Sequence, residues 1–472
     1  MNRAGRFSGD GELVLTRSWF GQDALYYALT CDGRTLLWAD EMAAILADPA
    51  VDRRLDSAAL VEEAVLGFPT GTRTVFRAVR QVPPGGSVRA RFAPWGRLEV
   101  EVSVPPPPPA PERGDGPGLE ARLYNAVSAA IYGGGAVLLS GGVDSTLLAV
   151  LARRAARVAS VPLVAVTAIS GDESSRADRG MARRVCQHLV IQGLEVMVEP
   201  AGSPLDRWCQ VVRLIASPRI LTGSVAAACG AVRGTVPVVL CGEGADELFA
   251  GYWWIYPHPR LYVEGLRRRL DALLRARGGE VPGASEVAAR IGEWERLGNA
   301  DLFRALYWMN LTERLPHLHL RTARVEAAPT PVAFPYLDPQ VIDYALAQTP
   351  GELVRGGVTK RPLRDLVRAL LPGGLGEAVA SRNKVGLPDA AAGLRAAVAG
   401  AVAALPGVEW DSHPLRWLYP DRLQRFTADL FLYLFFCHGG HPPADFDPQG
   451  LYVRFDRDRA WREAAPQLVL AS

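Results

Sequence analysis

The sequence predicts an α/β fold combined with an α+β one: a parallel-sheet domain over residues 119–472, preceded by a smaller β-rich domain over residues 1–104. Three observations support this prediction. Apolar runs of strand length alternate with helical patterns after residue 119, which is typical of a parallel sheet covered by helices on both faces. Short β-type runs bounded by turn residues occupy the first part of the chain. Between the two parts, residues 105–118 are rich in proline and glycine, as in a stiff linker.

The elements of the first part follow from local patterns. Runs of β-forming residues predict strands at residues 13–15 and 35–39, and a helical pattern predicts a short helix at residues 55–66. A turn at Pro83-Pro84-Gly85-Gly86 precedes an alternating strand at residues 87–92. This part has no constellation of catalytic residue types by itself.

The second part reads as alternating helices and strands. Apolar runs predict strands at residues 136–139, 162–169 and 235–240 and an edge strand at 194–198; helical patterns fall at residues 119–132, 145–156, 175–190, 204–216 and 223–233. In such sheets ligands bind beyond the carboxyl ends of the strands. We therefore look for function in the loops that follow these strands.

Composition excludes several classes of protein. Basic and acidic residues number 52 and 50, for a formal charge of +2, which argues against nucleic-acid or membrane-surface binding. The six cysteines are scattered with no CxxC pair, so we expect reduced thiols and no zinc or iron–sulfur site. We find no signal-peptide pattern and no long uncharged apolar stretch, and therefore expect a cytoplasmic protein.

The first candidate site is the loop Ser140-Gly141-Gly142-Val143-Asp144-Ser145, between a predicted strand and a predicted helix. Such a turn points backbone N–H groups and a helix N-terminus at one spot, which suits phosphate. Ser140, Ser145 and Thr146 add hydroxyl donors. Asp144 would repel a phosphate unless a cation lies between them, so it implies Mg²⁺. The alternative is an ordinary strand-to-helix turn.

The second candidate site is the stretch from Gly242 to Tyr252, which follows the predicted strand at residues 235–240. It places three carboxylates, Glu243, Asp246 and Glu247, close together, and a metal ion or a proton normally relieves their repulsion. Asp144 and Asp246 could share Mg²⁺ bound to a triphosphate. The alternative is a solvated acidic turn.

The first loop resembles the PP-loop of the ATP pyrophosphatases, which cut ATP between its α- and β-phosphates and form an adenylate. Together the two loops resemble the asparagine synthetase family. Further motifs shared with that family are Phe334-Pro335-Tyr336-Leu337-Asp338, Lys360-Arg361-Pro362-Leu363-Arg364 and Arg382-Asn383-Lys384. The resemblance implies ATP and Mg²⁺ as cofactors and a PP-loop synthetase domain.

The N-terminal part resembles the glutaminase domain of the same family, but only its middle and end. The segments that show this resemblance are residues 22–27, 37–41 and 82–86. Asn2 stands where the family has its nucleophilic cysteine, so we expect a truncated, inactive glutamine-amidotransferase-like domain. Residues 323–333 also lack the charged features that bind aspartate in asparagine synthetases.

Two relatives with an inactive N-terminal domain are the β-lactam synthetases and the lasso-peptide macrolactam synthetases. Glu243 stands where the β-lactam enzymes carry a tyrosine, which disfavours β-lactam closure. We therefore expect macrolactam formation in a linear core peptide, with a leader-binding protein and a leader protease as partners. The alternatives are a β-lactam or other small-molecule amide synthetase, a tRNA-modifying ATP pyrophosphatase, and a non-enzymatic scaffold.

The resemblance also implies a role for each site residue. Ser140, Gly141, Gly142 and Ser145 would hold pyrophosphate, and Lys360 would grip it. Glu243 would be the general base, and Lys384 would stabilise charge in the transition state. The remaining nucleotide-binding positions are Leu139, Asp144, Thr146 and Gly242, and the metal ligands are Asp144 and Asp246. The chain has two lysines, Lys360 and Lys384, and both fall at family positions.

Some residues outside these motifs have open interpretations. Trp253, Trp254 and Tyr256 could line a peptide pocket or form a core aromatic cluster. We interpret the basic helix at residues 264–277 as a solvated face. His317 and His319 are two positions apart, which does not suit a metal pair on a helix, so we interpret them as structural or surface residues.

Overall fold

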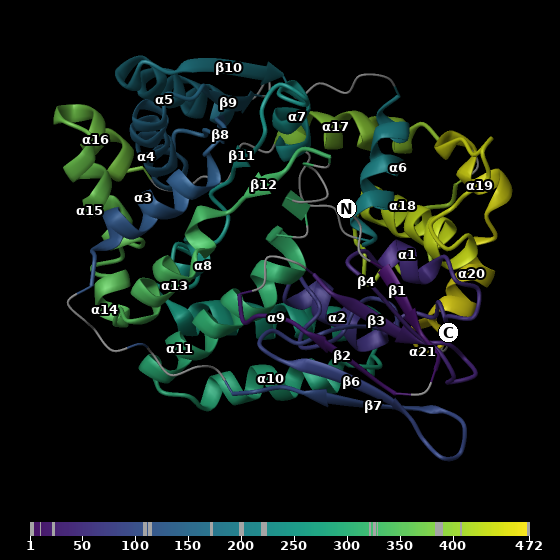
Figure 1. Cartoon of the computed structure of the whole chain (residues 1–472). Helices are drawn as coiled ribbons and strands as arrows, with labels where there is room; N and C mark the ends of the chain where they lie inside the picture. The colour runs from purple at the N-terminus through teal and green to yellow at the C-terminus, as the bar shows by residue number, and fades with distance from the viewer. Residues whose placement is uncertain are drawn as a thin grey trace.

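The computed structural model describes residues 4–469 apart from residues 10, 21–23, 107–110, 112–115, 170–172, 198–202, 219–223, 321, 324–326, 328, 383–389 and 406–407. The predicted fold class is confirmed. A parallel sheet covered by helices forms the centre of the large C-terminal part, and two antiparallel sheets form the N-terminal part (Figure 1).

The two antiparallel sheets share one core. The first has the order β1 (Ala4–Phe7), β4 (Leu36–Ala39), β3 (Tyr26–Leu29), β5 (Val79–Gln81), and the second has the order β2 (Glu12–Thr16), β6 (Ser87–Phe92), β7 (Leu98–Ser103). Neighbouring side chains of a strand point to opposite faces. Tyr27 therefore packs between the two sheets, whereas Tyr26 packs into the main core of the molecule.

Two short helices complete the N-terminal part, α1 (Met42–Leu46) and α2 (Ser57–Val65). Asp56 caps α2, because its carboxylate accepts a hydrogen bond from the Ala59 N–H at 3.1 Å. The helix packs against two helices of the large part, α9 (Pro259–Arg277) and α10 (Ala284–Arg296). The small domain is thereby attached to the large one through an apolar helical contact.

The parallel sheet has five strands in the order β10 (Gln192–Met197), β9 (Leu163–Ile169), β8 (Gly135–Leu138), β11 (Val239–Leu240), β12 (Val332–Ala333). Helices α4 (Val143–Ala159) and α5 (Glu173–Leu189) pack on it, and so does α7 (Ser224–Ala231). Val137 contacts the core that contains α4, whereas Ala136 contacts the core that contains α7. The sheet is therefore covered on both faces, and β10 forms one edge as predicted.

The other helices surround this sheet or connect it to the N-terminal part (Figure 1). In chain order they are α3 (Leu119–Ala130), α6 (Pro204–Ile215), α8 (Ala245–Leu248), α11 (Asn299–Met309), the π-helix η1 (Asn310–Leu320), the short 3₁₀ helix η2 (Pro335–Leu337), α13 (Pro339–Leu346), α14 (Pro350–Leu353), α15 (Arg361–Leu370), α16 (Gly373–Ala380), α17 (Ala390–Ala403), α18 (Arg422–Phe431), η3 (Leu432–Cys437), η4 (Pro448–Gly450), α19 (Leu451–Arg454), α20 (Arg457–Ala464) and α21 (Pro466–Val469).

The C-terminal helices return to the N-terminal domain. The Leu55 N–H donates to the Ala464 carbonyl at 2.6 Å, and the ring of Phe76 lies 5.4 Å from that of Phe431. In Figure 1 the α20–α21 region accordingly lies beside β1 and α1. The first and last parts of the described chain thus pack against each other.

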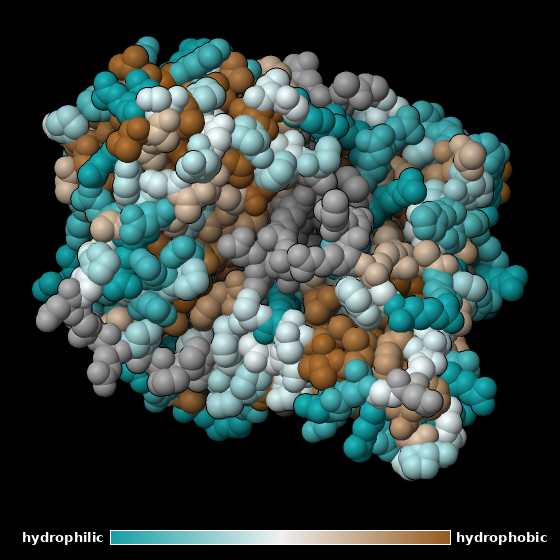
Figure 2. Space-filling model, in the orientation of Figure 1, coloured by the Kyte–Doolittle hydropathy of each residue, from teal (hydrophilic) through white to brown (hydrophobic). Residues whose placement is uncertain are grey.

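One predicted strand is shorter than expected. The predicted strand at residues 235–240 is reduced to Val239–Leu240, because Pro237 has no N–H to donate to a neighbouring strand. None of the described helices is both long and apolar enough to cross a bilayer. Hydrophilic residues cover much of the visible face, and the hydrophobic ones form separate patches (Figure 2).

Candidate active site

The first glycine loop joins β8 to α4 and is closed by its own hydroxyl groups. Ser140 and Ser145 place their Oγ atoms 3.1 Å apart, and the Ser140 N–H donates to Ser145 Oγ at 3.2 Å. Gly141 has a φ of +76°, which favours glycine. A Cβ there would lie 2.8 Å from the Cβ of Met181 in α5. The loop therefore takes a conformation that needs glycine, with its backbone pressed against α5.

The residues on either side of this loop differ in their hydrogen bonding. The Leu139 carbonyl accepts a hydrogen bond from the Thr167 hydroxyl in β9 at 2.8 Å. Thr146 lies in the first turn of α4, and its hydroxyl is buried with no hydrogen-bond partner among the described residues. A ligand oxygen at this helix N-terminus would satisfy such a donor.

The second loop joins β11 to α8 and lies against the first. A Cβ on Gly242 would be 3.5 Å from the Cβ of Asp144. Gly244 has a φ of +93°, and a Cβ there would overlap Leu337 of η2 at 2.6 Å. Because both loops follow neighbouring strands of one parallel sheet, their carboxylates meet at the same edge.

Lys360 joins the two loops. Its Nζ lies 2.5 Å from Asp144 Oδ2 and 2.6 Å from Asp246 Oδ1, and the lysine is 3% exposed. The backbone there is left-handed, with φ of +53° at Lys360 and +51° at Ala250. Such strained, buried residues concentrate at functional sites. We call Asp144, Asp246 and Lys360 the ion-paired centre.

The ion-paired centre contains two carboxylates and one ammonium group, so its net charge is negative. One of its carboxylate oxygens also accepts no hydrogen bond from the described residues. Asp144 Oδ1 is buried and has no hydrogen-bond partner in the described part of the chain. The residues therefore fit a divalent cation, since Mg²⁺ is usually held by one or two carboxylates plus phosphate oxygens. No cluster of three or more candidate metal ligands occurs among the described residues, so those residues alone do not form a complete cation cage.

The two other motifs of the large domain support this centre. Tyr336 donates its hydroxyl hydrogen to the Asp144 carbonyl at 3.0 Å, and Asp338 caps α13 by accepting from the Gln340 N–H at 2.9 Å. Arg364 donates to the Thr359 carbonyl at 2.7 Å and to the Ala380 carbonyl. These residues hold the centre in place and do not themselves enter it.

Comparison with known proteins agrees with this geometry. A family model described as asparagine synthase matches residues 119–430, which span both loops and the ion-paired centre. The chain belongs to the asparagine synthase family. Members of this family are ATP-dependent ligases that form amide bonds. A model described as a glutamine amidotransferase domain matches residues 8–93, and a search of curated proteins found no match.

Within this asparagine synthase fold, Glu243 lies beside a histidine that the sequence did not connect with it. His319 in η1 places Nδ1 3.6 Å from Glu243 Oε2, and its Nε2 lies 3.1 Å from the Tyr252 hydroxyl. Tyr252 donates its hydroxyl hydrogen to Glu247. Burial, and next the Glu247 carboxylate, raise the pKa of Tyr252 well above its ordinary value, so the phenol stays protonated.

This arrangement indicates which atom donates between His319 Nε2 and the Tyr252 hydroxyl. Because the Tyr252 hydrogen points to Glu247, its oxygen accepts from the Nε2–H of His319. His319 Nδ1 then lies on the side of Glu243, 3.6 Å from its Oε2. His317, two positions earlier, instead contacts the Gly71 carbonyl at 3.3 Å in the N-terminal domain. No spacing rule in the sequence distinguishes these two histidines.

Lys384 lies outside the described residues, and so does Asn383. The neighbouring Arg382 is described: it forms an ion pair with Asp178 and donates to the Ala177 carbonyl at 3.2 Å, both in α5. The chain that leads to Lys384 is therefore anchored on the helix that supports the first glycine loop.

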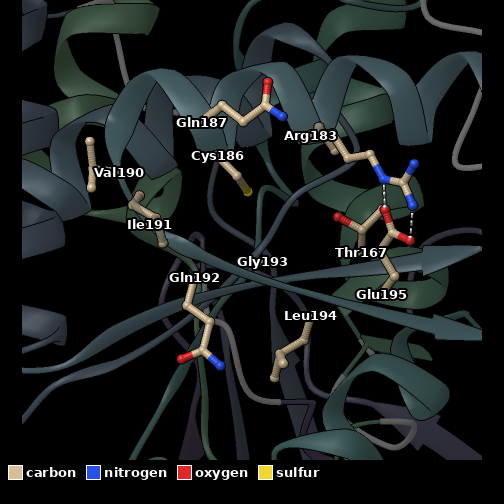
Figure 3. A pocket seen from close by; sticks show the side chains of 11 residues that line it. Thr167, Arg183, Cys186, Gln187, Val190, Ile191, Gln192, Gly193, Leu194 and Glu195 are labelled. Atoms are coloured by element: carbon tan, nitrogen blue, oxygen red, sulfur yellow. Dashed lines mark hydrogen bonds and ion pairs between the residues drawn. The ribbon is translucent and has the colours of Figure 1, made fainter.

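A hollow of about 750 Å³ lies at the edge of the sheet between α5 and β10 (Figure 3). Its charged groups satisfy one another, because Glu195 pairs with Arg179 and Arg183. These hydrogen bonds lower the pKa of Glu195 to about 2. Cys186 points across to Gly193, where a side chain would crowd its sulfur. None of the candidate site residues that the structure describes lines this hollow.

Proposed function

We propose that this chain forms a macrolactam in a linear peptide: it adenylates a side-chain carboxylate and transfers the acyl group to an amine of the same peptide. The observation that carries the proposal is the ion-paired centre at the ends of β8 and β11, with Glu243 on the adjoining loop. This arrangement suits phosphate chemistry followed by deprotonation of an amine.

In the first step the substrate carboxylate attacks the α-phosphorus of ATP, and the bond to the β-phosphate oxygen breaks. Pyrophosphate leaves toward the Ser140–Gly142 loop, where N–H and hydroxyl groups and the N-terminus of α4 favour anions. Lys360 is the cation that we assign to the departing pyrophosphate. Mg²⁺ on Asp144 and Asp246 would neutralise further negative charge on the phosphates.

In the second step the substrate amine attacks the acyl carbon, and AMP leaves as the amide forms. Glu243 takes the proton that the amine loses, and His319 holds the Glu243 carboxylate in position. Lys384 remains our candidate for stabilising charge on the tetrahedral intermediate. Each step then has a residue assigned to the charge or proton that it moves.

The nitrogen donor is an amine already present on the substrate. Within residues 8–93, which match the amidotransferase domain, Cys31 is the one cysteine, and it lies exposed in a turn. A glutaminase of this type needs an activated thiolate, and we propose that this exposed turn cysteine does not serve as one. Glu243, in place of the tyrosine of β-lactam synthetases, favours a lasso-type macrolactam over a β-lactam.

The test is incubation of the full chain with Mg²⁺, [α-³²P]ATP and synthetic linear peptides that have a free N-terminus and an internal Asp or Glu. We expect labelled AMP, with a product lighter than the peptide by one water. Asp144→Asn should reduce AMP formation by about 100-fold or more, and Lys384→Ala should slow ring closure. Labelled ADP in place of AMP would refute the mechanism. AMP with small-molecule acids only would favour a small-molecule amide synthetase.

A further inference from the structure

A groove of about 780 Å³ lies where α9, η1 and the segment after the second loop meet the N-terminal domain. Its main side chains are Trp253, Trp254, Leu261, Tyr262, Arg269 and Arg314. Leu66 and Gly67, just after α2, form its N-terminal edge. We call it the tryptophan–arginine groove. Its volume is in the range of pockets that bind small ligands or a few peptide residues.

The groove exposes large apolar side chains. Trp253 is 55% exposed, Trp254 is 40% exposed and Leu261 is 57% exposed. The two indole rings pack edge to face, with centroids 5.8 Å apart. Tyr256, by contrast, is buried in a core cluster with Phe303. Exposed indoles beside a hollow are typical of a surface that packs against an apolar ligand.

The groove also contains two arginines, Arg269 and Arg314, that form no salt bridge with a described residue, although the buried Glu247 carboxylate acts on Arg314 electrostatically. Arg267 and Arg268 of α9 pair with Glu295 and Glu264, whereas Arg269 donates only to the Val65 carbonyl, at 3.4 Å, in the described part of the chain.

Arg314 is the second of these arginines. Its guanidinium lies 4.6 Å from the Tyr252 ring centroid, and its buried Nε has no hydrogen-bond partner among the described residues. None of the described residues that line the groove carries a carboxylate. Its charge therefore suits an anionic group on a ligand.

Two short pieces of chain connect the groove to the active site. Trp254 packs against Tyr252 with centroids 5.0 Å apart, and Tyr252 contacts His319 beside Glu243. Gly251 lies against Lys360 and Asp246. A ligand in the groove would therefore be separated from the candidate base Glu243 by the side chains of Tyr252 and His319.

We propose that the tryptophan–arginine groove binds a flanking segment of the peptide substrate, one that carries a carboxylate next to a large apolar side chain. The apolar side chain packs on Trp253 and Trp254, and the carboxylate binds between Arg269 and Arg314. The groove thus selects peptides by a segment outside the reacting carboxylate and amine. This inference rests on the proposed function for the identity of the ligand as substrate.

The experiment measures direct binding to the full chain without ATP, by calorimetry. The two probes are acetyl-Phe-Glu-Phe-amide and its neutral counterpart acetyl-Phe-Gln-Phe-amide. We expect the Glu probe to bind about tenfold more tightly, because the charge-assisted bonds form in a partly desolvated groove. Arg269→Gln should remove this preference. Arg268→Gln, at the adjacent exposed position on α9, should keep it.

A second pair of variants tests the apolar part. Trp253→Ala should weaken binding of both probes about equally, whereas Trp95→Ala, which removes an exposed tryptophan of the N-terminal domain, should leave both unchanged. Equal affinities of the two probes for the wild-type chain would overturn the proposal. So would equal effects of Arg268→Gln and Arg269→Gln.

These outcomes are separate from the test of the proposed function. Probe binding that depends on Arg269, in a chain that forms no AMP with any peptide, would support the groove and refute the ligase assignment. Ring closure with a KM unchanged by Arg269→Gln and Trp253→Ala would support the ligase and refute the groove.

Discussion

Gly251 is the residue on which the ion-paired centre depends most directly. A Cβ at this position would lie 2.1 Å from both Asp246 Oδ1 and Lys360 Cε. Neither atom can withdraw easily, because Asp246 and Lys360 are 6% and 3% exposed. Only glycine permits the backbone to run this close to the ion pairs.

We predict that Gly251→Ala displaces Lys360 from the two carboxylates. AMP formation should fall by about 100-fold, with a loss of about 1–3 kcal/mol in unfolding free energy from overpacking. Pyrophosphate release and urea denaturation measure the two effects. Gly400→Ala in α17, where an added Cβ meets nothing within 4 Å, is the control and should be neutral or slightly stabilising. A fully active Gly251→Ala protein would show that the centre tolerates displacement.

His319 is a positioning residue that we expect to affect the second chemical step, amide formation, and not the first, adenylation. We predict that His319→Gln slows amide formation by about 10- to 100-fold and leaves adenylation, measured as ATP–pyrophosphate exchange, near the wild-type rate. The pH profile of amide formation should also change, because glutamine, unlike histidine, has no ionisable group beside Glu243. His317→Gln, which affects a contact to the N-terminal domain, should change neither step. Equal losses in both steps would indicate that His319 only maintains the fold.

Among the helices, α5 contacts both the first glycine loop and the edge strand β10. It packs against Gly141 through Met181 and Ala182, and it is tied to the edge strand β10 by the Glu195 ion pairs with Arg179 and Arg183. Because β10 pairs on one side only, these side-chain bonds replace the support of a further strand. The glycine loop thus depends indirectly on the edge of the sheet.

We predict that Glu195→Gln lowers stability by about 0.5–1 kcal/mol near neutral pH, the range for a largely solvated ion pair. The pKa of Glu195 is about 2 in the folded chain, compared with about 4.3 for an unperturbed glutamate. The carboxylate therefore contributes stability above about pH 4.3, and this contribution is lost as the pH falls toward about 2. Urea midpoints of wild type and variant should converge over that window. Glu264→Gln, in an exposed pair on α9, should differ little from wild type throughout.

At the scale of the whole molecule, a buried polar cluster fixes the C-terminal helices that close over the N-terminal domain. Asp429 is 0% exposed. It accepts hydrogen bonds from Trp461 Nε1 at 2.8 Å, Tyr452 Oη at 2.8 Å and His413 Nε2 at 3.1 Å. Because these donors come from three separate segments, the carboxylate joins α18 to both α19 and α20.

We predict that Asp429→Ala destabilises the chain by about 3–5 kcal/mol, since the buried donors of Trp461 and His413 and the partly buried hydroxyl of Tyr452 lose their acceptor. Thermal unfolding followed by tryptophan fluorescence measures this loss. Asp421→Ala removes an exposed cap of α18 and should cost about 1 kcal/mol. Similar losses for the two variants would show that the cluster is not a centre of stability.

Patterns among neighbouring residues were sufficient to predict the local chemistry. The alternation of apolar runs and helical patterns predicted the covered parallel sheet, and the two glycine loops after strands predicted the positions of Asp144 and Asp246, because these patterns depend on neighbouring residues. The strand at residues 235–240 was predicted too long, since Pro237 limits its pairing.

Contacts between groups that are distant in the chain became known from the folded structure. Lys360 reaches Asp144 across 216 positions, His319 rather than His317 faces Glu243, and Arg269 faces a groove while its neighbour Arg268 pairs with Glu264. Nothing in the local sequence distinguishes these alternatives. They depend on how the helices pack around the sheet, and packing is decided by contacts between residues far apart in the chain.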